Sequence, residues 1–208
     1  MNPLSLPDSK AKLLDAAMGV IRRKGYHATR VEDICQEAGV SKGSFFHHFR
    51  SKEEAALAAA QGFAERAEEL FGHAAHRAAA DPLDRLIGYV DFRRSLMQGD
   101  LAAFTCLLGT MAQETYSAQP HIAEACGRHI DEHAATLMPD IAAAKAAHAP
   151  DAPWKSRSVA LFIQAVIQGA FVLAKAKQDP AVAADCLDHL RRYLTMSFNE
   201  PAEKENAR

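Results

Sequence analysis

The chain has 208 residues, of which 49% are hydrophobic, enough to bury a sizeable core in one small and one larger domain. Charge is uneven, because residues 1–52 carry nine Lys and Arg against five Asp and Glu, and the remainder carries fifteen against twenty-one. The most apolar run, residues 159–174, is shorter than a bilayer span, and the first ten residues have no apolar core. We therefore expect a cytoplasmic protein with free thiols, outside the membrane, whose basic end contacts phosphate.

The first predicted helix covers residues 9–24. Leu13, Ala17 and Ile21 form one apolar stripe at helical spacing, and Gly25 is expected to end the helix.

Residues 29–52 predict two short helices joined by a tight turn, followed by the start of a third. Thr29 and Glu32 are the expected capping box of the first short helix, and Gly39 is expected to end it in a left-handed conformation. Ser41 is expected to cap the next helix. Such a pair of helices has the geometry that places its second member in a DNA major groove.

Two further features support this helix-turn-helix. Phe45 and Phe49 lie one turn apart and can anchor the second helix to the first. Ser51 and Glu54 form a second capping box, which opens the next helix.

The segment AGVSKGSFFHHFRSKEE resembles the DNA-binding head of the TetR (tetracycline-repressor) family. The resemblance implies an all-α fold with a three-helix helix-turn-helix head in residues 1–52, a helical effector-binding and dimerisation body in residues 53–200, and a disordered tail in residues 201–208. It further implies a homodimeric repressor, without enzymatic activity or cofactor, that binds a palindromic operator in double-stranded DNA. A small-molecule effector or an oxidant would release it from DNA.

The DNA contacts are expected on the second helix of the head and at two helix N-termini. The candidates are Thr29, Ser41, Lys42, Gly43, Ser44, Phe46, His47, His48 and Lys52. Phe46 stands where the family usually has a tyrosine, so a phosphate-binding hydroxyl is lost there and apolar contact with a thymine methyl becomes the alternative.

The remaining segments all show helical spacing, with no alternation typical of strands. Helices are predicted over residues 51–77, 82–98, 102–115, 121–147, 154–177 and from 180 onward, with a loop at 148–153.

An effector cavity is expected in the body, because the resemblance implies one among the middle helices. Its candidate residues are Phe63, Tyr89, Phe92, Arg93, Phe104, Leu107, Met111, Glu114, Phe162 and Val166, which ordinary core packing would explain equally well.

The two C-terminal segments are apolar over much of their circumference, which requires cover on more than one side. An internal core is one explanation; the resemblance favours a four-helix dimer interface. The candidates are Val166, Gly169, Ala170, Leu173, Cys186, Leu187, Leu190, Tyr193 and Leu194.

Cys106 and Lys175 lie in segments that resemble those of an electrophile- or oxidant-responsive branch of the family, although Thr105 replaces a usual glycine. A lysine near a thiol would favour the reactive thiolate. A buried cysteine and a solvated lysine form the simpler alternative.

Two other classes of function stay open. The pairs His129/His133 and His73/His76 have helical spacing but no third ligand in the sequence, so we expect no metal site. An all-helical enzyme could use histidines and Glu114 for acid–base chemistry, and a helical scaffold could use only the apolar C-terminal pair.

Overall fold

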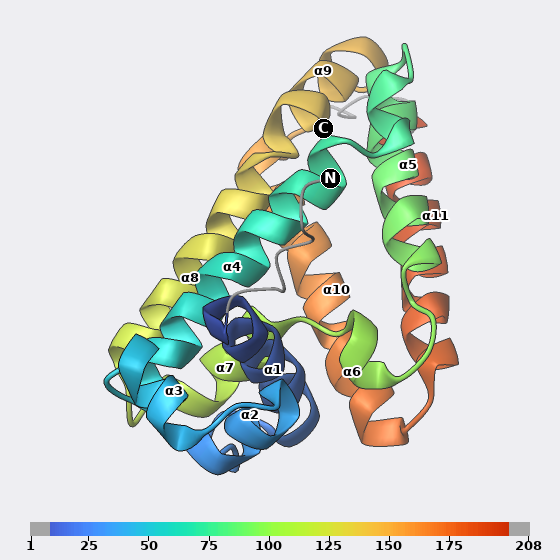
Figure 1. Cartoon of the computed structure of the whole chain (residues 1–208). Coiled ribbons are helices and arrows are strands. Elements are labelled where there is room, and N and C mark those ends of the chain that lie inside the picture. Colours follow the sequence, from blue (N-terminus) through green and yellow to red (C-terminus); the bar gives the residue numbers. More distant parts are fainter. Residues whose placement is uncertain (1–8, 200–208) are drawn as a thin grey trace, which may run out of the picture. The chain divides into compact units, whose positions relative to one another are not determined.

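The computed structural model describes residues 9–199, and this part of the chain contains helices and no strand (Figure 1), which confirms the all-α prediction. Tail residues 201–208 lie outside the described range. The helices are α1 Ser9–Lys24, α2 Val31–Ala38, α3 Lys42–His48, α4 Lys52–Gly72, α5 Pro82–Ser95, α6 Leu101–Phe104, α7 Leu107–Thr115, α8 Pro120–Ala135, α9 Met138–His148, α10 Ser156–Lys177 and α11 Pro180–Asn199, with a 3-10 helix, η1, at Ala75–Ala78.

The chain divides into two compact units. The first comprises Met1–Glu68 and Thr105–Ile130, and the second comprises Glu69–Phe104 and Asp131–Arg208, so α4 and α8 each contribute to both. The functional boundary expected after Lys52 falls at the first residue of α4 and stays a prediction.

In the first unit, α1 packs against α2, α3 and α7. The apolar stripe of α1 is buried as predicted, because Leu13, Ala17 and Ile21 are each at most 1% exposed. This packing holds the short helices α2 and α3, which are too short to be stable by themselves.

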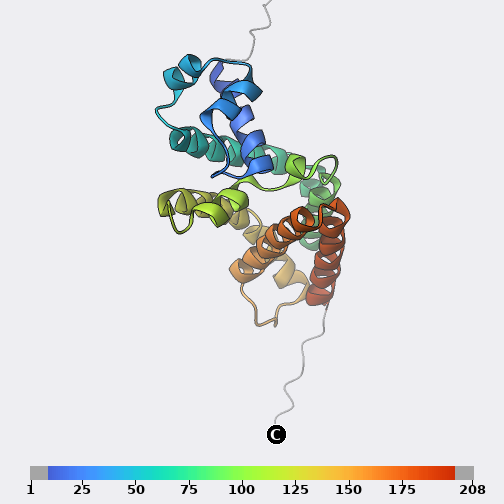
Figure 2. The same ribbon diagram turned by 90° about the horizontal axis from the view of Figure 1, so that it is seen from below.

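In the second unit, α10 and α11 lie side by side (Figure 2), α11 also packs against α5, and α5 packs against α9. The core between them contains Leu86, Ile163, Ile167, Leu187 and Leu190, all buried.

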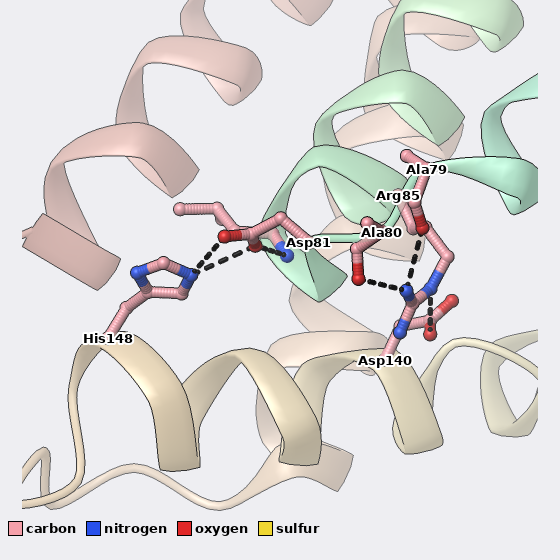
Figure 3. A network of polar contacts seen from close by, with 7 residues as sticks. Ala79, Ala80, Asp81, Arg85, Asp140 and His148 are labelled. Atoms are coloured by element: carbon pink, nitrogen blue, oxygen red, sulfur yellow. Dashed lines mark hydrogen bonds and ion pairs between the residues drawn. The ribbon is translucent and has the colours of Figure 1, made fainter.

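A polar network fixes the start of α5 against α9 (Figure 3). Asp81 caps α5, and His148 Nε2 lies 2.9 Å from its carboxylate oxygens. The Arg85 Nε donates to Asp140 at 2.8 Å, and its Nη1 donates to the carbonyls of Ala79 and Ala80. The network therefore satisfies carbonyls of the loop that precedes α5.

Three predicted helices are shorter than predicted or are interrupted in the structure. The helix predicted to reach residue 77 ends at Gly72, before η1. The helix predicted at 102–115 is broken at Thr105 and Cys106, and that predicted at 121–147 is broken at Thr136 and Leu137. Pro139, in the first turn of α9, has no N–H to continue a helix from α8.

Candidate nucleic-acid interface

The turn between α2 and α3 is set by one glycine and one serine. Gly39 has φ 65°, and its N–H donates to the carbonyl of Gln36, which ends α2 as predicted. The Ser41 hydroxyl accepts from the Ser44 N–H at 3.2 Å, which confirms the predicted cap of α3.

Two phenylalanines fasten the inner face of α3. Phe45 is fully buried and Phe49 is 3% exposed, with ring centroids 5.6 Å apart. The expected anchor is confirmed, and it determines which side of α3 faces outward.

The outward face of α3 carries most of the predicted DNA contacts. Lys42, Gly43 and His47 are exposed, and the Phe46 side chain is 56% exposed. Ser44 is half-buried. The exposed Phe46 ring lies on the same helix face as small and cationic side chains, and the contact of this face with DNA stays a prediction.

His48 is less available than its neighbour His47. It is half-buried, and its Nε2 lies 2.7 Å from the hydroxyl of Ser9 on α1. The structure thus gives His48 a contact within the head, while its role in DNA binding stays a prediction.

Acidic side chains of α2 form ion pairs with basic side chains of α1 and α3 and so neutralise part of the positive charge of the head. Arg23 pairs with Glu37 at 2.9 Å, Lys24 with Asp33 at 2.8 Å, and Lys42 with Glu32. The hydrogen bond from Lys42 lowers the pKa of Glu32. Arg30 and Arg50 are also exposed in this unit and can contribute to a positive field toward phosphates.

The predicted roles of Thr29 need correction. Thr29 is 1% exposed and its hydroxyl donates to the carbonyl of Gly25 at 2.6 Å, so it is not placed to donate to phosphate. The cap of α2 is formed one residue later, where the Asp33 carboxylate accepts from the Arg30 N–H at 2.9 Å.

Lys52 is similarly engaged inside the first unit. Its Nζ donates to the carbonyls of Tyr26 and Thr29 at 2.9 and 3.0 Å and lies 4.3 Å from the centroid of the Tyr26 ring. Burial lowers the pKa of this amine. The geometry gives Lys52 a structural role, and only the N-terminus of α4 beside it remains suited to a phosphate.

The second predicted capping box is confirmed at Ser51 and shifted at Glu54. The Ser51 hydroxyl accepts from the Glu54 N–H at 3.1 Å, but the Glu54 carboxylate accepts from the N–H of Arg50 at 2.7 Å.

Glu114 contacts the loop after α1, and its role toward an effector stays a prediction. Its carboxylate accepts from the His27 N–H at 2.9 Å, and its carbonyl lies 2.9 Å from the His27 ring nitrogen Nε2. Glu114 therefore holds the loop after α1, which sequence spacing could not indicate because the two residues are far apart in the chain.

The other predicted effector residues fall into two groups. Phe63, Leu107 and Met111 belong to the first unit, and Leu107 and Met111 are fully buried there. Tyr89, Phe92, Arg93, Phe104, Phe162 and Val166 belong to the second unit. Of these, Phe162 is 40% exposed, on the apolar face of α10 that suits a partner surface better than a cavity.

Part of the second group forms a cluster around Tyr89. The Tyr89 hydroxyl lies 2.9 Å from His133 Nε2, and Gln164 Nε2 donates to that hydroxyl at 3.3 Å. The Arg93 guanidinium carbon lies 5.0 Å from the centroid of the Phe71 ring. This cluster combines aromatic rings with a few polar groups, which are the kinds of residue that line small-molecule sites.

Two histidines of this cluster were missed by sequence reasoning. His133 bonds Tyr89, and burial, with a smaller effect from Arg93, lowers its pKa to about 4. His76 is half-buried, with its ring centroid 5.8 Å from that of Phe92. The available signal was their spacing, which suggested only metal pairs; no group of three or more potential metal ligands occurs among residues 9–199.

Cys106 is a helix cap. It is 6% exposed, and its Sγ accepts from the Gly109 N–H at 3.5 Å at the start of α7. Burial raises the pKa of the nearby Cys126 thiol to about 12, with a smaller contribution from Cys106. Lys175 lies on α10 in the second unit, and its pairing with Cys106 stays a prediction.

The predicted dimer residues separate into an inner and an outer set. Ala170, Leu187, Leu190 and Leu194 are buried in the core of the second unit, so that core packing accounts for them, and their part in an interface stays a prediction. Val166 and Cys186 are half-buried, and Gly169, Leu173 and Tyr193 are exposed.

The outer set continues into further apolar side chains. Leu161, Val172 and Met196 are exposed, and Phe162 packs on Tyr193 with ring centroids 4.9 Å apart. By length and composition alone α10 could cross a membrane, but one side of it packs in the core of the second unit.

Comparison with known proteins gives two family matches. Residues 13–59 match the model described as "Bacterial regulatory proteins, tetR family". Residues 82–189, more than half of the chain, match the model "Transcriptional regulator LmrA/YxaF-like, C-terminal domain".

Individual relatives agree with these matches. The HTH-type transcriptional regulator CymR of Pseudomonas putida is 42% identical over 62 residues, 30% of each chain. The transcriptional regulator AcuR of Cereibacter sphaeroides is 30% identical over 115 residues, 54% of this chain and 52% of that protein. The chain thus spans about half or less of the length of these curated relatives.

A solved structure covers nearly the whole fold. A TetR transcriptional regulator from Chloroflexus aurantiacus superposes with a TM-score of 0.78 at 26% identity, over 90% of this chain and 94% of that one.

Proposed function

The chain belongs to the TetR family of bacterial transcriptional regulators, and from this premise we propose that it represses transcription by binding an operator in double-stranded DNA. The observation that carries the proposal is the outward face of α3, where Lys42, Gly43, Phe46 and His47 are exposed together on a helix capped by Ser41. A short helix held by buried aromatics and preceded by a tight turn can enter a major groove.

The proposed regulator acts as a homodimer. The exposed apolar face on α10 and α11, with Phe162, Leu173, Tyr193 and Met196, supports this assembly because a second copy would remove it from water. Two heads related by a two-fold axis would recognise a palindromic operator. Burial of this face against the second copy would also explain why α10 is so apolar in a cytoplasmic protein.

A small-molecule effector would bind the body and release the DNA. The cluster around Tyr89, His133 and Gln164 in the second unit supports this part of the proposal. We propose no enzymatic activity, since the relatives are named as transcriptional regulators.

The proposal is tested by titrating the purified full-length protein onto its own upstream DNA at low and moderate salt. Sequence-selective binding that weakens as salt rises is expected, because each phosphate contact releases counterions. If neither this DNA nor any fragment recovered in a genome-wide selection is bound selectively, the proposal fails.

A further inference from the structure

Arg93 differs from the other two arginines of α5. Arg85 pairs with Asp140 at 2.8 Å and Arg94 pairs with Asp188 at 2.7 Å. Within residues 9–199 Arg93 makes no ion pair, and its Nε is shielded from water without a hydrogen-bond partner.

Aromatic rings surround this cation instead of carboxylates. The Arg93 guanidinium carbon lies 5.0 Å from the ring centroid of Phe71 and 5.6 Å from that of Phe171. Such contacts stabilise the positive charge, but a ring face does not replace the oxygen acceptors that a guanidinium's five N–H groups seek. The side chain is thus held in place by aromatic rings, while the N–H of its buried Nε has no acceptor among residues 9–199.

The polar groups beside Arg93 supply no compensating negative charge. Gln164 donates to the hydroxyl of Tyr89, which lies 2.9 Å from His133 Nε2. His133 is neutral near pH 7, because burial, together with the charge of Arg93, lowers its pKa to about 4. This neutral chain leaves the guanidinium as the one charge of the cluster.

The rings around the cation give the cluster apolar walls. The ring centroid of Phe71 lies 5.2 Å from that of Tyr89 and 5.4 Å from that of Phe92. His76 adds a second buried nitrogen, Nδ1, that has no hydrogen bond within the described part of the chain. A ligand that matches these groups chemically would combine an apolar body with oxygen acceptors.

We propose that Arg93 binds the carboxylate of a small apolar organic acid, which is the effector of this protein. A carboxylate can accept two parallel hydrogen bonds from a guanidinium, and this geometry makes the pair strong and selective. The inference deepens the proposed function and rests on it for the release of DNA, although binding of the acid can be measured without DNA.

The test uses purified full-length protein and three probe acids, benzoate, cinnamate and octanoate, each compared with its primary amide. Calorimetric titration should show that at least one acid binds saturably. Its amide should bind at least about tenfold more weakly, as expected for the loss of a hydrogen bond to a charged group. Arg93→Gln should remove this preference. Arg94→Gln, the neighbouring arginine whose charge is paired with Asp188, should keep it.

Three results would overturn the inference: equal binding of acids and amides by the wild type, binding of no acid in the panel, or undiminished acid binding by Arg93→Gln. Circular dichroism checks that the variant is folded. If it is not, Arg93→Lys provides the measurement, since an ammonium should keep the preference for acids with a lower affinity; loss of discrimination in a folded Lys variant would contradict the inference.

DNA binding measured in the same preparations separates this inference from the proposed function. Arg93→Gln should bind operator DNA like the wild type but stay bound when the acid is added. A wild type that binds the acid and no DNA would contradict the proposed function alone, whereas DNA binding without acid binding would contradict only the role of Arg93.

Discussion

Gly25 shows how a single residue joins the head to α7. It has φ 85°, and a Cβ added there would lie 2.2 Å from Oε1 of Glu114, whose carboxylate accepts from the His27 N–H. Gly25→Ala should therefore lower the free energy of unfolding by roughly 1–3 kcal/mol, through backbone strain and the displaced carboxylate. Urea denaturation measures the change.

Gly127 offers the matched control for that substitution. It is exposed in α8, and no atom lies within 4 Å of a Cβ placed on it. Gly127→Ala should raise the free energy of unfolding by about 0.5–1 kcal/mol, since alanine favours a helix. Equal effects of the two substitutions would contradict the close contact at Gly25.

Cys106 can be tested without disturbing its structural role. Serine is a good helix cap, so Cys106→Ser should keep α7 and leave the free energy of unfolding unchanged or slightly higher. If the thiol is the oxidant sensor, this variant should stay on DNA under oxidant, while Cys186→Ser should be released like the wild type. Release of both variants alike would show that Cys106 has a structural role and is not the sensor.

At the scale of helices, the sequence predicted those boundaries that are marked by local chemistry. Ser41, Gly39 and the Asp81–Pro82 pair act through backbone groups within a few residues, so their roles could be read from the sequence. Thr29 was misassigned because two local bonds compete: its hydroxyl donates to the Gly25 carbonyl, and Arg30 takes the cap position of α2.

The two breaks within the predicted helices differ in their local signals. Pro139 marks the break before α9, because it lacks the N–H that a continuous helix would need. Cys106 caps α7 from an otherwise apolar stretch and carries no strong local signal. Only part of the cluster around Arg93 could be predicted. Tyr89, Phe92 and Arg93 lie on one helix and were candidates, but His133 comes from α8, which is distant in the sequence.

The contact of α5 with α9 should make stability depend on acid pH. The hydrogen bond with His148 lowers the pKa of Asp81, so its carboxylate stabilises the folded state above the ordinary pKa of about 3.9, and this contribution is lost as the pH falls through the lowered pKa (Figure 3). Asp81→Asn keeps a capping residue but lacks the charge.

We expect Asp81→Asn to unfold at lower urea concentration than the wild type at pH 7, and the difference to shrink toward about pH 3. Asp84→Asn, at an exposed position of the same helix, controls for the loss of one negative charge. A difference that stays constant with pH would show that the His148 contact does not contribute through charge.

At the scale of the whole molecule, the apolar face of α10 and α11 predicts assembly. Leu173 is 48% exposed, so Leu173→Glu should leave the fold of the isolated chain intact while placing a charge in the proposed dimer surface. Sedimentation velocity should show a dimer for the wild type and a monomer for this variant. Tyr116→Glu, on a tyrosine that is 73% exposed in the first unit, should stay dimeric. A monomeric wild type, or a dimeric Leu173→Glu variant, would contradict the proposed surface.

The measurement that tests the central claim most directly is a fluorescence-anisotropy titration of operator DNA with the wild type and with the double variant Phe46→Ala/His47→Ala. Both side chains are exposed on α3, so the variant should fold normally and lose selectivity for operator over unrelated DNA, each lost base contact costing about 1–3 kcal/mol. Tyr116→Ala should bind like the wild type. Undiminished selective binding by the double variant would show that α3 does not read the DNA.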